Sequence, residues 1–263
     1  MRETYVPVLQ ARQKRKVKRP LIGDVDHTEK ETTVSDKFLQ SILRPLAMLL
    51  LSPVVLLFSL YVALVYGYLY LLITTIPEVF TSNYDFSTSQ VGLVYLGMGI
   101  GMMTSVIIFG IVSDWLLRRL SSKTTSGEMK PEHRLPPLVP GAFLVPAGII
   151  LYGWSAQYQL HWAIPILGTV FLGAGLNSIL MSIQTYLVDA FPLYEASALA
   201  ANTVLRSAAG ALLPLVGPDM YRALGLGWAS SLLGLIAFAF VPVPFLFLRY
   251  GERLRAADRF QNH

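Results

Sequence analysis

Six long apolar stretches constrain this chain more than any other feature of its sequence. They cover about 52–77, 90–113, 137–155, 161–188, 197–217 and 228–248, and the first has no charged residue from Ser52 to Pro77. A helix needs about 20 apolar residues to cross the roughly 30 Å of a bilayer's hydrocarbon core. Only 14% of the residues are charged and 54% are hydrophobic, which is too little charge to cover a soluble surface. The sequence therefore predicts an all-α membrane protein with a bundle of six transmembrane helices.

The basic residues indicate the orientation of these helices. Ten of the 21 Lys and Arg residues lie in 1–44, five in the connection after the second stretch, and four after the sixth. The connections after the first and third stretches have none, and the one after the fifth has only Arg222. Because cationic loops stay on the cytoplasmic side, both termini are predicted to be cytoplasmic. This pattern accounts for 19 of the 21 basic residues, so the net charge of +5 does not predict nucleic-acid binding.

Three parts of the chain follow from this pattern. Residues 1–44 form a basic cytoplasmic segment, 45–248 the transmembrane bundle, and 249–263 a cytoplasmic tail. The start, from Met1 to Arg19, is polar and basic and has no apolar core followed by a cleavage site, so no signal peptide is predicted. The first apolar stretch is then expected to direct its own insertion.

The sequence predicts neither an enzyme nor a bound cofactor. It has no cysteine, which excludes disulfides and thiolate metal sites. The four histidines lie in loops, in termini or at the edges of the apolar stretches, and none lies one helical turn from a second histidine. A metal centre or a Ser-His-Asp arrangement is therefore not supported.

Small and aromatic residues within the stretches have structural interpretations. Gly97, Gly99 and Gly101 share the spacing of a phosphate-binding loop, but they lie in an apolar run with no strand before it. Glycines at such positions allow helices to approach closely in lipid, and the fourth stretch offers Gly168, Gly173 and Gly175 for the same purpose. Aromatic residues around the turn after the third stretch are interpreted as anchors at the membrane interface. These are Tyr152, Trp154, Tyr158 and Trp162.

The fifth stretch carries Asn202 and Arg206 in its interior. A cation in a bilayer is costly unless it faces a polar cavity or has a partner. One interpretation is that Arg206 faces a translocation pathway, where it pairs with a substrate, with Asp189 or Glu195, or with the missing half of a larger protein. The other is that the membrane span starts later than about residue 197 and that Arg206 extends to the interface. Glu195 and Arg206 are eleven residues apart, about three helical turns, and can share one helix face.

Two further pairs of residues are candidates for a substrate cavity. Tyr66 and Tyr70 are four residues apart in the first stretch, and Asn177 and Gln184 are seven apart in the fourth, so each pair lies on one helix face. Such faces are typical of a cavity that binds amphipathic molecules. Hydrogen bonding between helices explains each residue equally well.

Several segments together resemble the major facilitator superfamily, specifically its fungal drug:proton antiporter branch. The segments are 2–9 (RETYVPVL), 110–119 (GIVSDWLLRR), 186–191 (YLVDAF), 198–207 (ALAANTVLRS) and 225–228 (GLGW). The second resembles the loop signature between paired helices of that family. It keeps the Gly, the Asp and the closing Arg pair but lacks the Arg after the Asp and the second Gly. The likeness covers essentially the whole chain.

The resemblance implies the second six-helix half of a major facilitator fold, built as a 3+3 repeat, and alternating access around a site at the membrane midplane. It implies efflux of a small amphipathic substrate in exchange for protons, across the plasma membrane. Residues at the cytoplasmic helix ends would form a gate. The candidates are Gly110, Asp114, Arg118, Arg119, Asp189 and Glu195.

The first six helices of that family have no counterpart in this sequence. We therefore expect either a truncated gene or a gene model that begins at an internal methionine. One half offers a single wall of a cavity, so it would pair with a separate first half, with itself or with another transporter. The alternative function is a non-transporting membrane protein, or a regulator of a full-length relative.

Overall fold

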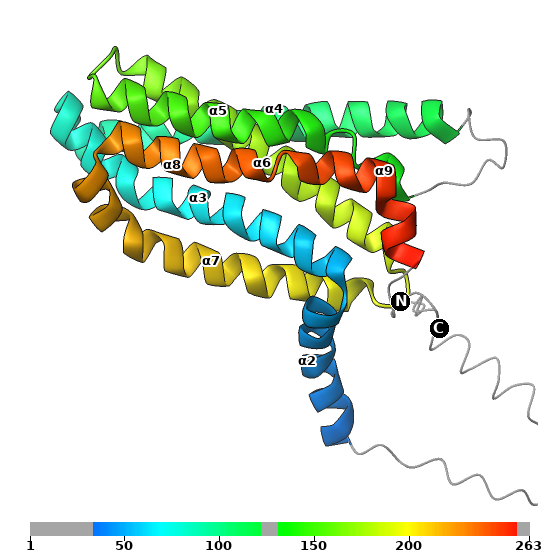
Figure 1. Cartoon of the computed structure of the whole chain (residues 1–263). Coiled ribbons are helices and arrows are strands. Elements are labelled where there is room, and N and C mark those ends of the chain that lie inside the picture. The colour runs from blue at the N-terminus through cyan, green and yellow to red at the C-terminus, as the bar shows by residue number, and fades with distance from the viewer. Residues whose placement is uncertain (1–33, 122–130, 257–263) are drawn as a thin grey trace, which may run out of the picture. The chain divides into compact units, whose positions relative to one another are not determined.

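The computed structural model describes the backbone of residues 34–121 and 131–256 (Figure 1). Side chains are described for 43–112 and for 131–251 apart from His133. The chain divides into two compact units, Met1–Phe38 and Leu39–His263. In the first unit only the beginning of helix α2 (Val34–Leu51) is described, and the helix bundle lies in the second.

The described part of the chain is helical. The bundle consists of α3 (Pro53–Tyr84), α4 (Thr88–Ser121), α5 (Leu138–Gln157), α6 (Ala163–Ala190), α7 (Glu195–Leu224), α8 (Leu226–Ala239) and α9 (Pro242–Ala256), and the short helix η1 (Pro131–Arg134) precedes α5. Within the described residues, six stretches are long and apolar enough to cross a membrane, the last being Leu226–Gly251, which joins α8 and α9. The predicted all-α class and the six membrane helices are confirmed.

The helices lie side by side (Figure 1) and pack in preferred pairs. α5 packs against α6 and α8, α4 packs against α6, and α3 packs against α7. α6 also contacts α3 and α7, so it contacts four of its neighbours. The polar candidates on α3, α6 and α7 are thereby brought to adjacent helices.

Glycines allow backbone contact between helices at these interfaces. A methyl group at Gly101 would overlap the carbonyl oxygen of Val170, and one at Gly173 would lie 2.6 Å from the carbonyl oxygen of Met98. The glycines that bring α5 against α6 in the same way are Gly141, Gly148, Gly168 and Gly175. The predicted packing role is thus confirmed for Gly101 and for the three glycines of α6. It is wrong for Gly99, where an added side chain would meet nothing within 4 Å.

Helix α3 continues seven residues beyond Pro77, where the sequence placed the end of the first stretch. Proline has no amide hydrogen, so the carbonyl oxygen of Ile73 loses its usual partner. The hydroxyl of Tyr95 on α4 donates a hydrogen bond of 2.7 Å to that oxygen. A neighbouring helix therefore satisfies the backbone group that proline leaves free, as continuation within a membrane requires.

The sixth stretch is broken, although its sequence was read as one plain helix. α8 ends at Ala239 and α9 begins at Pro242. Pro242 and Pro244 remove the amide hydrogens that would bond to Phe238 and Phe240. Instead, Val241 donates to the Phe238 carbonyl at 3.0 Å, and Val243 donates to the Phe240 carbonyl at 3.0 Å. Tighter local bonds thus carry the chain through the break.

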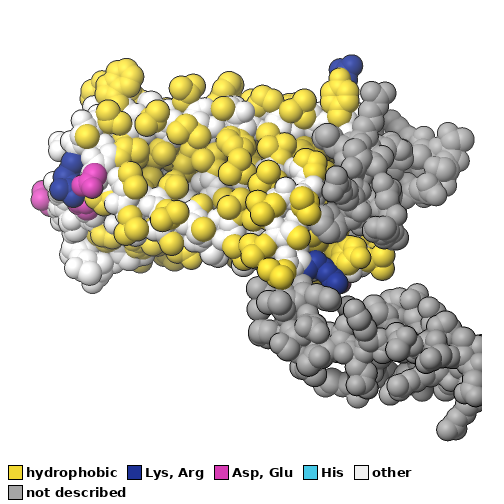
Figure 2. Space-filling view, turned by 60° about the horizontal axis from the view of Figure 1, so that its bottom comes forward, with side chains coloured by type: hydrophobic (Ala, Val, Ile, Leu, Met, Phe, Trp, Pro, Cys, Tyr) yellow, Lys and Arg dark blue, Asp and Glu magenta, His cyan; other side chains and the backbone are white. Residues whose placement is uncertain are grey.

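Apolar side chains cover the outside of the bundle as well as its core. Figure 2 shows a face on which hydrophobic side chains extend along the bundle while charged ones lie at its two ends. Leu215 on α7 is 73% exposed and Ile111 on α4 is 68% exposed. A water-soluble monomer rarely exposes apolar surface on this scale, whereas helices in lipid do. The chain is an integral, multi-pass membrane protein.

The four predicted interfacial aromatics differ in exposure. Tyr158 and Trp162 are 67% and 47% exposed, and Trp154 is half-buried. Tyr152 is fully buried, so the prediction that it is an anchor is wrong. It faces the bundle core because α5 is covered on both sides, by α6 and α8.

Replacing Gly101 by Val should destabilise the bundle, because the new side chain would collide with the backbone of α6 rather than with a movable side chain. Overpacking of this kind costs about 1–3 kcal/mol or more. Thermal unfolding in detergent, followed by circular dichroism, measures the effect. Gly99→Val on the same helix is the matched control and should leave the midpoint nearly unchanged. Equal losses in both variants would contradict the packing role of Gly101.

Candidate functional site

Arg206, Tyr66 and Tyr70 form a cluster where α7 packs against α3. The guanidinium carbon of Arg206 lies 5.0 Å from the centre of the Tyr66 ring. The rings of Tyr66 and Tyr70 are 5.3 Å apart, and Tyr70 is 40% exposed. Gly210, one turn beyond Arg206, contacts Tyr70, so the two helices hold this cluster closely. The structure thus brings together three of the six predicted cavity residues.

Arg206 lies well inside its helix. α7 begins at Glu195, and eleven residues at 1.5 Å each put Arg206 about 16 Å from that end. The helix therefore does not begin near Arg206. The interpretation in which the membrane span starts later and Arg206 extends to the interface stays a prediction. The same distance keeps Glu195 out of reach of an ion pair with Arg206.

Asp189 is not the partner of Arg206 either. Its carboxylate accepts a hydrogen bond of 3.0 Å from Nε of Arg134, in an ion pair between η1 and the end of α6. Among the side chains that the structure describes, none forms an ion pair with Arg206. Its Nε is covered and has no hydrogen-bond partner there. What Arg206 does have is the face of Tyr66, an interaction of about 0.5–2 kcal/mol.

The other three candidates are amides, and none of the hydrogen bonds between described residues joins them to this cluster. Asn202, one turn before Arg206, is 1% exposed, and neither of its side-chain polar atoms has a hydrogen-bond partner in the described residues. Asn177 on α6 is 8% exposed, and its amide nitrogen likewise has no hydrogen-bond partner in the described residues. Gln184 is half-buried on α6. A role for these three in a cavity stays a prediction.

Tyr66 also borders a small gap on the side of α6. The gap is lined by Val62, Val65, Tyr66, Leu176, Ile179 and Leu180 and is too small to hold a water molecule. Apart from the tyrosine hydroxyl, these side chains are apolar. The sequence analysis did not single out the α6 residues, because nothing distinguishes a leucine beside such a gap from one in the core. Tyr66 therefore has a cation over its ring and apolar side chains as its neighbours on α6.

The structure describes the side chains of some gate candidates and only the backbone of others. Gly110 lies in α4, and a side chain added there would meet nothing within 4 Å. Asp114, Arg118 and Arg119 continue α4, but their side chains lie outside the described residues. Glu195 is exposed and opens α7, where a carboxylate interacts favourably with the positive end of the helix dipole. Their role in a gate stays a prediction.

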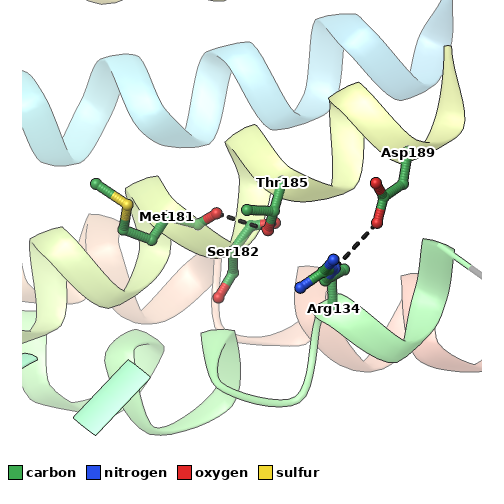
Figure 3. A network of polar contacts seen from close by, with 5 residues as sticks. All are labelled: Arg134, Met181, Ser182, Thr185 and Asp189. Atoms are coloured by element: carbon green, nitrogen blue, oxygen red, sulfur yellow. Dashed lines mark hydrogen bonds and ion pairs between the residues drawn. The ribbon is translucent and has the colours of Figure 1, made fainter. Parts of the chain in front are cut away.

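The ion pair of Asp189 holds the end of α6 to the segment before α5 (Figure 3). One turn earlier on α6, the Thr185 hydroxyl hydrogen-bonds to the carbonyls of Met181 and Ser182. Near this end, the guanidinium carbon of Arg44 lies 5.3 Å from the ring of Tyr194 in the α6–α7 turn. Arg134 and Arg44 are functional candidates that the sequence analysis missed, because each is one cation among many in a basic segment.

A family model described as Major Facilitator Superfamily matches residues 5–214. The MFS-type transporter penM of Penicillium rubens is 52% identical over 99% of this chain and 51% of its own length. The MFS-type transporter atr4 of Stereocaulon alpinum is 49% identical over 98% of the chain and 47% of its own length. The efflux pump radE of Floropilus chiversii is 44% identical over 99% of the chain and 49% of its own length.

The chain thus spans about half the length of these curated relatives. Their names describe transport rather than catalysis, and all three come from fungi. The family resemblance drawn from the sequence is confirmed. No solved structure matches the chain.

The Arg134–Asp189 pair should contribute little to stability. Its side chains are 26% and 39% exposed, and exposed ion pairs contribute about 0–1 kcal/mol. A double-mutant cycle with Arg134→Gln and Asp189→Asn, followed by thermal unfolding in detergent, should give a coupling energy in that range that falls at high salt. A coupling energy above about 2 kcal/mol would contradict this prediction, because it would show an ion pair far stronger than exposed pairs usually form.

Proposed function

The chain belongs to the major facilitator superfamily, and from this premise we propose that it forms one six-helix half of a transporter for small amphipathic molecules. In this proposal the half works by alternating access, in which two bundles rock around a site at the membrane midplane. Efflux is the proposed direction, because one close relative is named an efflux pump. Proton antiport is the proposed driving force, and the plasma membrane the proposed location.

The observation that carries this proposal is the cluster of Arg206, Tyr66 and Tyr70. A cation at the centre of a transmembrane helix costs about 2.5–3.5 kcal/mol on insertion scales, and such residues mark substrate or ion pathways. Arg206 is half-buried, and beside it lie the half-buried Tyr66 and the exposed Tyr70. A purely structural arginine would be expected to have a carboxylate partner within the bundle. This combination supports a binding wall.

The second half of the cavity would be supplied by another six-helix bundle. The most apolar parts of α7 and α4 have only 17% and 33% of their residues buried, compared with 67% in α3. The uncovered residues of α4 and α7 leave room for a partner bundle on these two helices, and the arrangement of the family implies that α5 and α8 face lipid. Both termini are proposed to be cytoplasmic, because the connections with many cations alternate with those that have few.

An export assay tests the proposal directly. The chain would be expressed in a pump-deficient yeast alone, together with the first half of the penM relative, and with an empty vector. Efflux of three dyes of different charge would be followed: rhodamine 6G, Nile red and fluorescein. Export of at least one dye when both halves are present is the expected result. If both halves reach the membrane and co-purify yet export none, the transport proposal is wrong, and a non-transporting or regulatory role would replace it.

Replacing Asp114 by Asn should reduce export at least about threefold without changing the amount of protein in the membrane. The reason is that a charged group in a gate stabilises one of two states by about 1 kcal/mol or more, whereas insertion depends on the apolar stretches. Asp219→Asn is the matched control, since Asp219 pairs with Arg222 at the far end of α7. Unchanged export by the Asp114 variant would remove this residue from the gate.

A further inference from the structure

We propose that the Arg206–Tyr66–Tyr70 cluster recognises the anionic group of a planar aromatic substrate, such as an aromatic carboxylate or an ionised phenol. This proposal rests on the proposed function and specifies the chemical class of molecule that the site would take. It starts from the charge of Arg206, which no described carboxylate balances.

The distribution of carboxylates shows why the missing anion is not in the described part of this chain. Its own helix carries Glu195 and Asp219, eleven residues before and thirteen after Arg206, or about 16 and 20 Å along the axis. On α3, Glu78 lies twelve residues beyond Tyr66, about 18 Å away along that helix. The described carboxylate of α6 is Asp189, which is already paired with Arg134. Each of these acids lies toward a helix end, and Arg206 lies between the ends.

The surroundings of Arg206 favour a substrate over a carboxylate from a partner bundle. An ion pair between helices needs only the two charged groups. Here the guanidinium lies against the ring of Tyr66, the neighbouring Tyr70 is 40% exposed, and the side chains of α6 around Tyr66 are apolar. A flat apolar body would pack on the exposed ring of Tyr70, while its charged group meets the guanidinium. This is the usual composition of a small-molecule site, apolar walls with a few placed polar groups.

The guanidinium of Arg206 favours a ligand that carries an oxyanion. Its planar fork of donors matches a carboxylate in two parallel hydrogen bonds, and it stays charged at all physiological pH values. A cationic drug at this position would meet repulsion.

Binding of three matched probes tests the charge preference. Naphthoate, naphthamide and naphthylmethylammonium share one aromatic body and differ in charge. Each would be titrated against the full chain in nanodiscs and followed by ligand-observed NMR, which detects weak binding. We expect naphthoate to bind at least about tenfold more tightly than naphthamide, and the cation to bind most weakly, because a charge-assisted hydrogen bond corresponds to a factor of about ten or more in affinity.

Substitutions test which residue causes the preference for naphthoate over naphthamide. Arg206→Gln should lower naphthoate affinity about tenfold to a hundredfold and leave naphthamide nearly unchanged, whereas Arg206→Lys should keep part of the preference. Arg222→Gln is the matched control, since it removes an exposed cation of the same helix, and it should bind naphthoate like the unmodified chain. Tyr70→Leu should weaken naphthoate and naphthamide alike. Circular dichroism establishes whether each variant is folded. If the Arg206→Gln variant does not fold, the Arg206→Lys variant still tests the proposal.

Three results would overturn the proposal. The first is equal binding of naphthoate and naphthamide by the unmodified chain, and the second is a preference that survives in the Arg206→Gln variant. The third is no binding of any probe together with a large loss of stability in that variant, which would assign the counter-charge to a protein carboxylate. Because the assay measures binding, its outcome is separate from transport: a charge preference without dye export would refute the proposed function alone.

Discussion

Every peptide group within the hydrocarbon core must find its hydrogen-bond partner inside the protein, because no water is there to supply one. This requirement explains why the described part of the chain is helical and how its prolines are accommodated. The carbonyl that Pro77 leaves free on α3 is bonded by the Tyr95 hydroxyl of α4. At the break between α8 and α9, Val241 and Val243 bond the carbonyls that two prolines would otherwise leave unpaired.

The lipid surroundings also determine how costly a polar or charged side chain is within the bundle. An apolar side chain has a similar free energy inside the bundle and on its lipid-facing surface, so the hydrophobic effect does not drive the helices together. Packing depends instead on close backbone contact at glycines such as Gly101 and Gly148. A charge is different, because lipid does not solvate it. Arg206 lies far from either end of α7 with an aromatic ring as its partner, and this makes it the residue from which a binding site is most directly argued.

The sequence alone predicts much of this fold, because features that depend on one helix can be read from its residues. The six apolar stretches, the packing role of most of the glycines and the position of Arg206 inside a span are of this kind. What could not be predicted depends on a second helix. Tyr95 allows α3 to continue past Pro77, Arg134 takes the carboxylate of Asp189, and α6 and α8 cover Tyr152. The polar candidates were likewise identified one helix at a time, and only packing shows that Arg206 of α7 meets Tyr66 of α3.

The central claim is that lipid surrounds these helices and that the basic connections lie on one side of the membrane. The chain has no cysteine, so single cysteines can be introduced and labelled without background. We would place them at Ser87 and Gln159, in connections without cations, and at Ser126, in the connection with five. On intact cells a membrane-impermeant maleimide should label the first two, and Ser126→Cys only after permeabilisation. Labelling of all three positions from the same side would contradict the account.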